Sequence, residues 1–162
     1  MLLALRALFW TLALPGLFAF FLPWTLFDLG SVAIDASDPW HLLGLVLIAA
    51  GTLLLLACIW EFARRGRGTL SPVDPPTRLV VSGLYQFVRN PMYLSVTLIV
   101  FGELLLTQSR GLFVYLVIWF AAVNLFVMAY EEPTLREQFG EDYERYTRAV
   151  GRWIPRLSPY RV

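Results

Sequence analysis

The chain has 162 residues, of which 58% are hydrophobic and 15% are charged, and its formal net charge is +1. Soluble domains have about 25% charged residues, so this composition argues against an ordinary soluble fold and favours a membrane protein. The near-neutral charge gives no basis for nucleic-acid binding, and the single cysteine, Cys58, excludes an internal disulfide or a multi-thiolate metal site.

Four apolar stretches approach the length of about 20 residues that a helix needs to cross the hydrocarbon core of a bilayer. The first two cover residues 7–22 and 41–60. Aromatic residues follow the first stretch where a signal peptide would be cleaved, so we interpret it as a retained helix. The third and fourth stretches, residues 91–107 and 112–129, are joined by a short link that predicts a tight helical hairpin. The sequence therefore predicts one all-α domain over residues 1–162, an integral membrane bundle of about four transmembrane helices.

Three residues inside these stretches receive structural interpretations. Gly44 and Gly51 are seven residues apart and could mark a helix-packing face. Glu103 lies near the far end of the third stretch, where we predict that it reaches water at the interface.

Arginine is concentrated in two of the segments outside the stretches. By the positive-inside rule these two segments lie in the cytoplasm together with both termini. This predicts a multi-pass protein of a bacterial-type inner membrane. The arginines concerned are Arg64, Arg65, Arg67, Arg78 and Arg89 in the segment before the third stretch, and Arg136, Arg145, Arg148, Arg152, Arg156 and Arg161 in the tail.

The tail, residues 131–162, contains an amphipathic pattern. Its apolar residues recur at spacings of three and four and form one stripe on a predicted helix from Pro133 to Val150. Such a helix either lies on the membrane or folds back over the cytoplasmic ends of the spans. The stripe consists of Leu135, Phe139, Tyr143, Tyr146 and Val150.

Polar residues cluster at the cytoplasmic boundary, where they could carry chemistry. The first cluster is residues 82–93, in which Asn90-Pro91 predicts the start of a helix. The free N–H groups and positive dipole end of that helix would hold a carboxylate, with Arg89 adding charge. The alternative is a plain helix start with Arg89 reaching lipid phosphates.

The second cluster is the adjacent pair Glu131-Glu132. These carboxylates could bind a sulfonium or ammonium group, ribose hydroxyls or a nearby arginine, or they could simply begin the tail helix with Pro133 in its first turn. The third cluster runs from Arg148 to Arg156 and either anchors the tail to lipid or grips an anionic substrate, for which the candidates are Arg148, Arg152 and Trp153.

Several kinds of site are excluded by the sequence. It contains no soluble Rossmann fingerprint, P-loop or zinc-ligand spacing, so we predict no metal, and a nucleotide-like cofactor must be held in another way. The only histidine, His41, falls at the outer face, which excludes a catalytic imidazole at the cytoplasmic clusters.

Taken together, the clusters resemble the isoprenylcysteine carboxyl methyltransferase family, within the wider group that includes membrane phospholipid methyltransferases. The matching residues occur in the family's order over nearly half of the chain. They are Gly83-Leu84-Tyr85, Arg89-Asn90-Pro91-Met92-Tyr93, Glu131-Glu132, Phe139-Gly140-Glu141-Asp142-Tyr143, Tyr146 and Val150 through Pro155.

The resemblance implies that S-adenosylmethionine enters from the cytoplasm into a pocket under the tail. It places Glu131 near the reacting centre, as the catalytic residue. The residues that it implies for cofactor binding are Thr77, Arg78, Leu79, Val80, Tyr85, Arg89, Asn90, Pro91, Met92, Tyr93 and Glu132.

The chain departs from the family pattern at two positions. Asn90 replaces a histidine, and asparagine can form hydrogen bonds but cannot transfer a proton near neutral pH. Val127 replaces an arginine that handles the substrate in the eukaryotic carboxyl methyltransferases, which argues against an isoprenylcysteine carboxylate as the acceptor.

We therefore expect S-adenosylmethionine-dependent methyl transfer to a lipophilic or small acceptor at the cytoplasmic face of the membrane. The alternative is a non-catalytic membrane scaffold that retains the fold, an interpretation favoured by Asn90. A haem or quinone protein fits poorly, because the one histidine is on the wrong side. The sequence leaves open which group accepts the methyl and which oligomer forms.

Overall fold

The computed structural model describes residues 13–27, 29–65 and 79–160, and every regular element in these ranges is helical. This confirms the predicted all-α class for the described part of the chain. The elements are a helix over Ala13–Phe27, which contains the π-turn η1 (Leu17–Phe21) and α2 (Leu22–Phe27), then η2 (Leu29–Ser31), α3 (Pro39–Arg65), η3 (Gly83–Gln86), α4 (Pro91–Thr107), α5 (Arg110–Phe126), the π-turn η4 (Val127–Glu131) and α6 (Glu132–Ala149).

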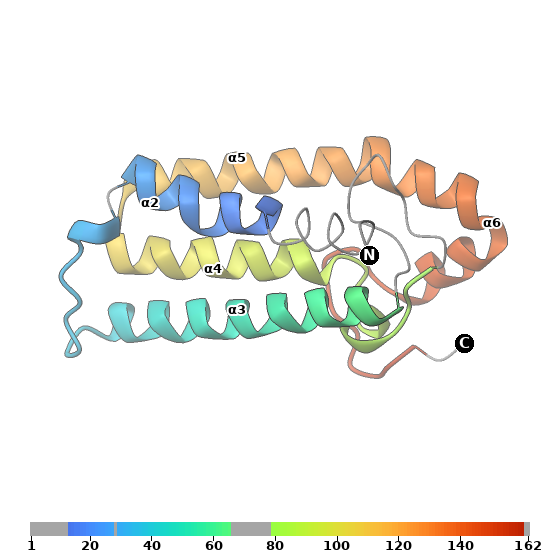
Figure 1. The fold of residues 1–162 in the computed structure, drawn as a ribbon, viewed down its shortest axis with the longest axis horizontal. Helices are drawn as coiled ribbons and strands as arrows, with labels where there is room; N and C mark the ends of the chain where they lie inside the picture. The colour runs from blue at the N-terminus through green and yellow to red at the C-terminus, as the bar shows by residue number, and fades with distance from the viewer. Residues whose placement is uncertain (1–12, 28, 66–78, 161–162) are drawn as a thin grey trace.

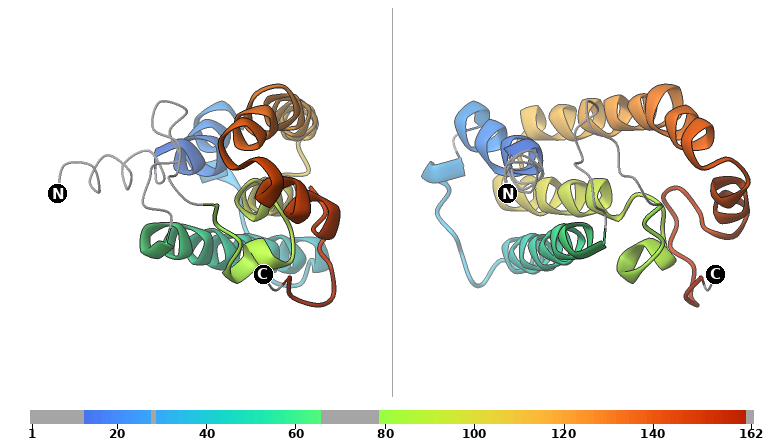
Figure 2. Two further views of the ribbon diagram at one scale, coloured as in Figure 1. Left: turned by 90° about the vertical axis from the view of Figure 1, so that its right-hand side faces the viewer. Right: turned by 45° about the vertical axis from the view of Figure 1, so that its right-hand side comes forward.

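Helices α3, α4 and α5 run side by side along the long axis, and α2 packs against the end of α5 that carries the hairpin (Figure 1). At the opposite end α5 continues through η4 into α6, which turns back across the end of the bundle (Figure 2). The candidate site residues gather at that end.

Two of the described helices are long and apolar enough to cross a membrane. They are Pro39–Glu61, with a mean hydropathy of 2.8, and the continuous helix Arg110–Ala149, whose most apolar window has a mean hydropathy of 2.4. They contain the predicted second and fourth stretches. The other two stretches correspond to shorter apolar helices, Pro91–Thr107 and, in its described part, Ala13–Phe27.

The first stretch was predicted to end at Leu22, but the helix continues to Phe27. The reason lies in the π-turn η1, which ends two residues before Pro23. A proline ring clashes with the carbonyl four residues earlier, here Ala19, and the wider π-turn makes room for the ring without ending the helix. The turn η4 has the same relation to Pro133.

Helices α3 and α4 approach each other through glycines. A Cβ atom on Gly44 would lie 2.7 Å from the carbonyl oxygen of Gly102, and a Cβ on Gly102 would lie 2.6 Å from that of Gly44. A Cβ on Gly51 would lie 2.9 Å from the carbonyl oxygen of Ser95. The predicted packing face is therefore confirmed, and it depends on small residues that allow the two backbones to come close.

We expect Gly102→Ala to lower the free energy of unfolding by about 1–3 kcal/mol, because the added methyl group forces two backbones apart. Gly16→Ala is the matched control, since a Cβ there meets no atom within 4 Å. Thermal unfolding in detergent measures both variants. Equal midpoints for the two variants would contradict this account of the helix contact.

The hairpin between α4 and α5 forms as predicted. Gln108 adopts the left-handed conformation with φ of 50°, and its N–H donates to the carbonyl of Leu104 at 2.8 Å. The Ser109 hydroxyl caps α5 by accepting from the N–H of Leu112. Gly111 lies inside α5, where a Cβ would be 2.8 Å from the ring of Phe27.

The prediction that Glu103 reaches water is wrong. Its side chain is only 5% exposed, and its Oε2 atom is buried without a hydrogen-bond partner among the described residues. Position near the end of a helix suggested solvent, but the rotation of α4 decides the outcome. Glu103 lies on the same helix face as the buried residues Ile99 and Leu106, four residues before it and three after it.

The tail helix is confirmed as α6, but it is not straight. Gly140 has φ of 50° and ψ of −124°, a conformation that glycine adopts readily and that divides the helix in two. The apolar stripe folds back onto the bundle end rather than lying free: Tyr143, Tyr146 and Val150 are buried together. The residues packed around them are Leu79, Val81, Leu135, Phe139 and Tyr160.

Candidate functional site

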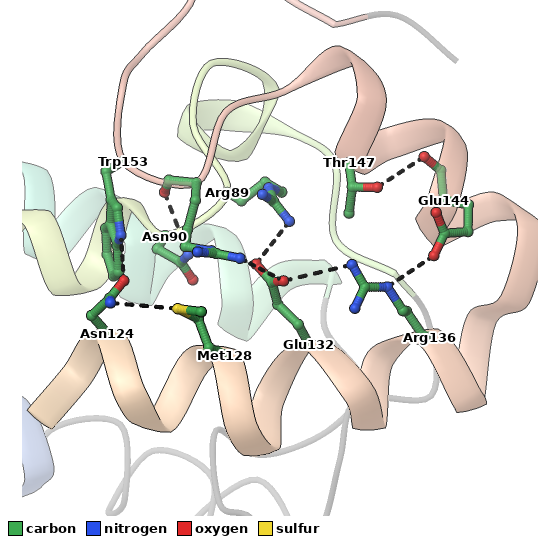
Figure 3. A network of polar contacts seen from close by, with 10 residues as sticks. Arg89, Asn90, Asn124, Met128, Glu132, Arg136, Glu144, Thr147 and Trp153 are labelled. Atoms are coloured by element: carbon green, nitrogen blue, oxygen red, sulfur yellow. Dashed lines mark hydrogen bonds and ion pairs between the residues drawn. The ribbon is translucent and has the colours of Figure 1, made fainter.

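The carboxylate of Glu132 is the centre of a charged network at the end of the bundle (Figure 3). Its side chain is 4% exposed. Arg89 Nη1 donates to Oε1 at 2.9 Å, and Arg152 donates to both oxygens, from Nε to Oε1 at 2.7 Å and from Nη2 to Oε2 at 2.9 Å. Arg136 Nη2 lies 3.7 Å from Oε2. One buried carboxylate thus joins the start of α4, the tail helix and the segment after it.

The pKa of Glu132 follows from this environment. Burial alone would raise it, but the hydrogen bond from Arg152 and the charges of Arg89, Arg152 and Arg136 outweigh burial and lower the pKa. Glu132 is therefore ionised at neutral pH, and its lone pairs are already used by protein donors.

Glu131 has the opposite environment. Its Oε2 accepts a hydrogen bond from the Tyr93 hydroxyl at 3.0 Å, and no arginine among the described residues forms an ion pair with it. Burial raises the pKa of Glu131, and the neighbouring charge of Glu132 raises it further, whereas the bond from Tyr93 lowers it. A proton therefore binds Glu131 more readily than an ordinary surface glutamate.

The π-turn η4 explains how two successive residues serve different partners. In η4 the N–H of Glu132 donates to the carbonyl of Val127, five residues earlier. This extra residue in the turn shifts the helix register, and Glu131 contacts α4 through Tyr93 while Glu132 contacts Arg89 before that helix. The signal in the sequence is Pro133, which cannot supply a backbone donor.

The segment after α6 closes over the start of α4. The backbone N–H of Arg89 donates to the carbonyl of Gly151 at 2.9 Å, and the Asn90 amide donates to the carbonyl of Arg152 at 3.4 Å. The Trp153 indole donates to Asn124 Oδ1 on α5 at 2.9 Å. Gly151, Arg152 and Trp153 are thereby fixed to the two residues before α4 and to α5.

Two features of this site fit an anionic group of a small molecule. Pro91 begins α4, and the first N–H groups of a helix have no partner inside the helix. Arg89 Nε is buried without a hydrogen-bond partner among the described residues. An orphaned guanidinium donor beside a helix N-terminus is suited to a carboxylate such as that of a methionyl moiety.

The structure brings five of the predicted site residues together at the end of the bundle. Arg89, Asn90, Tyr93, Glu131 and Glu132 meet as described above. Pro91 and Met92 are buried in the first turn of α4, and Val80 is also buried. Leu79 packs against the buried tail residues Tyr143, Tyr146 and Val150. The carbonyl of Tyr85 accepts a hydrogen bond from the Tyr146 hydroxyl at 2.6 Å. Thr77 and Arg78 lie outside the described residues.

The three predicted substrate residues have different environments. Arg152 is committed to Glu132, and Trp153 packs beside Phe120 with a ring-centroid distance of 5.2 Å. Arg148 is exposed and takes no part in the network. Val127, at the position of the family's arginine, is 1% exposed and belongs to the apolar core.

Sequence reasoning missed Asn124 as a site residue. This amide lies near the end of α5, on the helix side that carries Glu132 after the π-turn (Figure 3), and its Oδ1 accepts the hydrogen bond from the Trp153 indole. A polar residue near the end of an otherwise apolar span is the signal that could have found it.

Comparisons with known proteins identify the family of the chain. A sequence model described as phospholipid methyltransferase matches residues 39–142, which include α3, α4, α5 and both glutamates. An uncharacterized protein of Haemophilus influenzae is 35% identical over 63 residues, which are 39% of this chain and 100% of that protein. The chain belongs to the phospholipid methyltransferase family, the membrane methyltransferases related to the isoprenylcysteine carboxyl methyltransferases.

Proposed function

We propose that the protein transfers a methyl group from S-adenosylmethionine to a lipophilic or small acceptor at the cytoplasmic face of the membrane. The observation that carries this proposal is the contrast between two adjacent carboxylates. Glu132 is ionised and saturated by arginines, whereas Glu131 is paired with a phenol and has a raised pKa. Neighbouring acids whose environments separate their pKa values are typical of acid–base sites.

The cofactor would be held at the start of α4. The helix N-terminus and the free Nε–H of Arg89 would take its carboxylate, and Asn90 and Tyr85 lie on the adjoining segment. Burial raises the pKa of Tyr85 well above its usual value, so its phenol remains a hydrogen-bond donor. S-adenosylmethionine would supply an electrophilic methyl group on a sulfonium.

In this proposal Glu131 is the general base. An amine or hydroxyl acceptor forms its new bond to carbon as the carbon–sulfur bond breaks, and the acceptor's proton passes to Glu131. The Tyr93 hydroxyl holds the Glu131 carboxylate in place. A thiolate or carboxylate acceptor would need no base, and the protein would then contribute alignment and exclusion of water.

We propose that the acceptor reaches the site from the bilayer between α4 and α5. Trp153 is the best placed of the three candidate substrate residues, because it lies against Phe120 and Asn124 on α5. Arg152 would act by positioning Glu132, and Arg148 would contact only an acceptor with a large polar head. The arginine distribution supports the proposal that both termini lie in the cytoplasm.

The direct test is methyl transfer from radiolabelled S-adenosylmethionine to candidate acceptors in lipid nanodiscs. The panel contains an aminophospholipid, a lipid alcohol, a thiol and a prenylated acid. Incorporation into one class identifies the acceptor, and loss of incorporation in Glu131→Gln assigns it to this site. Equal labelling by wild type and Glu131→Gln would contradict the proposed base.

The raised pKa predicts the pH dependence of the reaction. A base acts when deprotonated, so kcat/KM falls as the pH falls through the pKa of Glu131. Because that pKa is raised, the acid limb lies above about 4.3, the ordinary value for glutamate. A pH–rate profile measures this acid limb. If Glu131→Gln shows the same acid limb as wild type, the limb belongs to another group.

The second candidate is a non-catalytic membrane scaffold. Asn90 favours it, because its amide serves a structural bond to the carbonyl of Arg152. A scaffold would not bind S-adenosylmethionine, whereas the proposed enzyme does.

A further inference from the structure

Two aliphatic side chains are highly exposed on the segment that follows α6. Ile154 is 81% exposed and Leu157 is 103% exposed. They flank Pro155 and Arg156 in a four-residue tip, residues 154–157, that has no regular secondary structure. Large apolar side chains are seldom left this bare on an ordered segment unless another surface covers them.

The tip is held firmly on both sides. A Cβ on Gly151 would lie 2.7 Å from the carbonyl oxygen of Ile154, so the chain turns tightly just before the tip. The N–H of Arg156 donates to the carbonyl of Phe87 at 2.9 Å, and the N–H of Tyr160 donates to that of Gln86 at 3.0 Å. The outward position of Ile154 and Leu157 therefore belongs to an ordered structure.

The position of the tip along the bundle follows from contacts between the end of the apolar span of α3 and the segment to which the tip is bonded. Glu61 closes the apolar span of α3, directly after Trp60, which is 63% exposed. Tryptophan at the end of a span marks the membrane interface. The Ser82 hydroxyl donates to Glu61, and a Cβ on Gly83 would lie 3.2 Å from the Glu61 side chain. The segment that begins there continues to Phe87, against which the tip is hydrogen-bonded.

Positive charge accompanies the apolar side chains. The guanidinium of Arg156 donates to the carbonyl of Ala149 at 3.2 Å, one residue after the exposed Arg148. Exposed aliphatic side chains with neighbouring arginines suit the boundary between acyl chains and anionic headgroups.

We infer that residues 154–157 form a membrane-surface anchor whose partner is the lipid interface, with Ile154 and Leu157 among the acyl chains and the arginines at anionic headgroups. The anchor lies on the same segment as Arg152, which holds Glu132, so contact with lipid fixes the cover of the candidate site. The anchor is independent of the proposed methyl transfer.

A nitroxide label tests the anchor directly. Leu157→Cys is labelled in a Cys58→Ser background and reconstituted in nanodiscs containing anionic phospholipid, and the label's collisions with oxygen and with a water-soluble nickel chelate are compared. Glu137→Cys, on the exposed face of α6, is the matched control. Ile154→Cys provides a second position if labelling at residue 157 perturbs the segment.

Insertion predicts that oxygen relaxes the label at 157 more than the nickel chelate does, with the opposite order at 137. If the nickel chelate relaxes the labels at residues 154 and 157 more than oxygen does, as at residue 137, the anchor is overturned. Dipolar broadening between two labels at 157 would also overturn it, because a second copy of the chain would then cover the tip. Loss or retention of methyl transfer affects neither outcome.

Discussion

Glu131→Gln is expected to lower kcat for an amine or hydroxyl acceptor by at least about 100-fold, the usual contribution of a general base. Glutamine keeps the size of the side chain and can still accept the hydrogen bond from Tyr93, but it cannot take up the acceptor's proton. Cofactor binding should change little, because the proposed carboxylate site at Arg89 is separate. Initial rates and calorimetry on the same preparation separate the two effects.

Glu137→Gln is the matched control for that experiment. It makes the same chemical change on the exposed face of α6, outside the site. We expect wild-type rates from it. If Glu131→Gln were as active as Glu137→Gln with every acceptor tested, Glu131 would not be the base.

Glu132→Gln is expected to lower the free energy of unfolding by about 3–5 kcal/mol, because breaking a buried pair leaves the other charges uncompensated. Arg89 and Arg152 would lose their shared partner while their side chains stay 12% and 27% exposed. Both arginines are held in place by backbone contacts of their own segments, so they cannot easily move into water.

Glu144→Gln provides the comparison. Glu144 also pairs with an arginine, Arg136, but their side chains are 43% and 48% exposed. Exposed pairs of this kind contribute about 0–1 kcal/mol. Denaturant unfolding in detergent followed by near-ultraviolet circular dichroism measures both variants. Similar losses in the two variants would mean that the Glu132 network is not a central element of the fold.

The same network predicts a pH effect on stability. The pKa of Glu132 is lowered in the folded state, so its contribution is complete above the unfolded pKa of about 4.3 and is lost as the pH falls through the folded value. The acid sensitivity of wild type should therefore be reduced in Glu132→Gln.

Much of the fold could be predicted because the bilayer imposes strong constraints on sequence. The apolar runs that became α3 and α5 are nearly uncharged over the length of a span, and a helix is the structure that satisfies its own backbone in lipid. The tail helix was visible in the spacing of Tyr143 and Tyr146. Gly44 and Gly51 were weak signals in one sequence, since their meaning depends on which helix faces them.

Features that depend on the rotation of a helix or on contacts between distant segments could not be predicted from the sequence. Glu103 was assigned to water by its distance from the helix end, but its face on α4 decided its burial. The kink at Gly140 is a small departure from an α-helix that local propensity does not predict, and Pro133 marks the π-turn only in retrospect. Asn124 gains meaning only because Trp153, far away in the chain, folds back onto it.

The candidate site was partly predictable for a chemical reason. Glu131, Glu132 and Arg89 are costly at a membrane boundary unless they have partners, and the structure supplies partners for all three. What the sequence did not reveal is the division of roles. The prediction assigned Glu132 to the cofactor, whereas its oxygens are occupied by Arg89 and Arg152, so we now expect it to organise the site.

The most direct test of the central claim is calorimetric titration of S-adenosylmethionine into the purified protein in nanodiscs. The account predicts saturable binding, weakened by about 10-fold or more in Asn90→Ala, because that residue lies at the start of α4, and unchanged in Glu137→Gln. Absence of binding at millimolar cofactor, in protein shown by circular dichroism to be folded, would contradict the account and favour the scaffold.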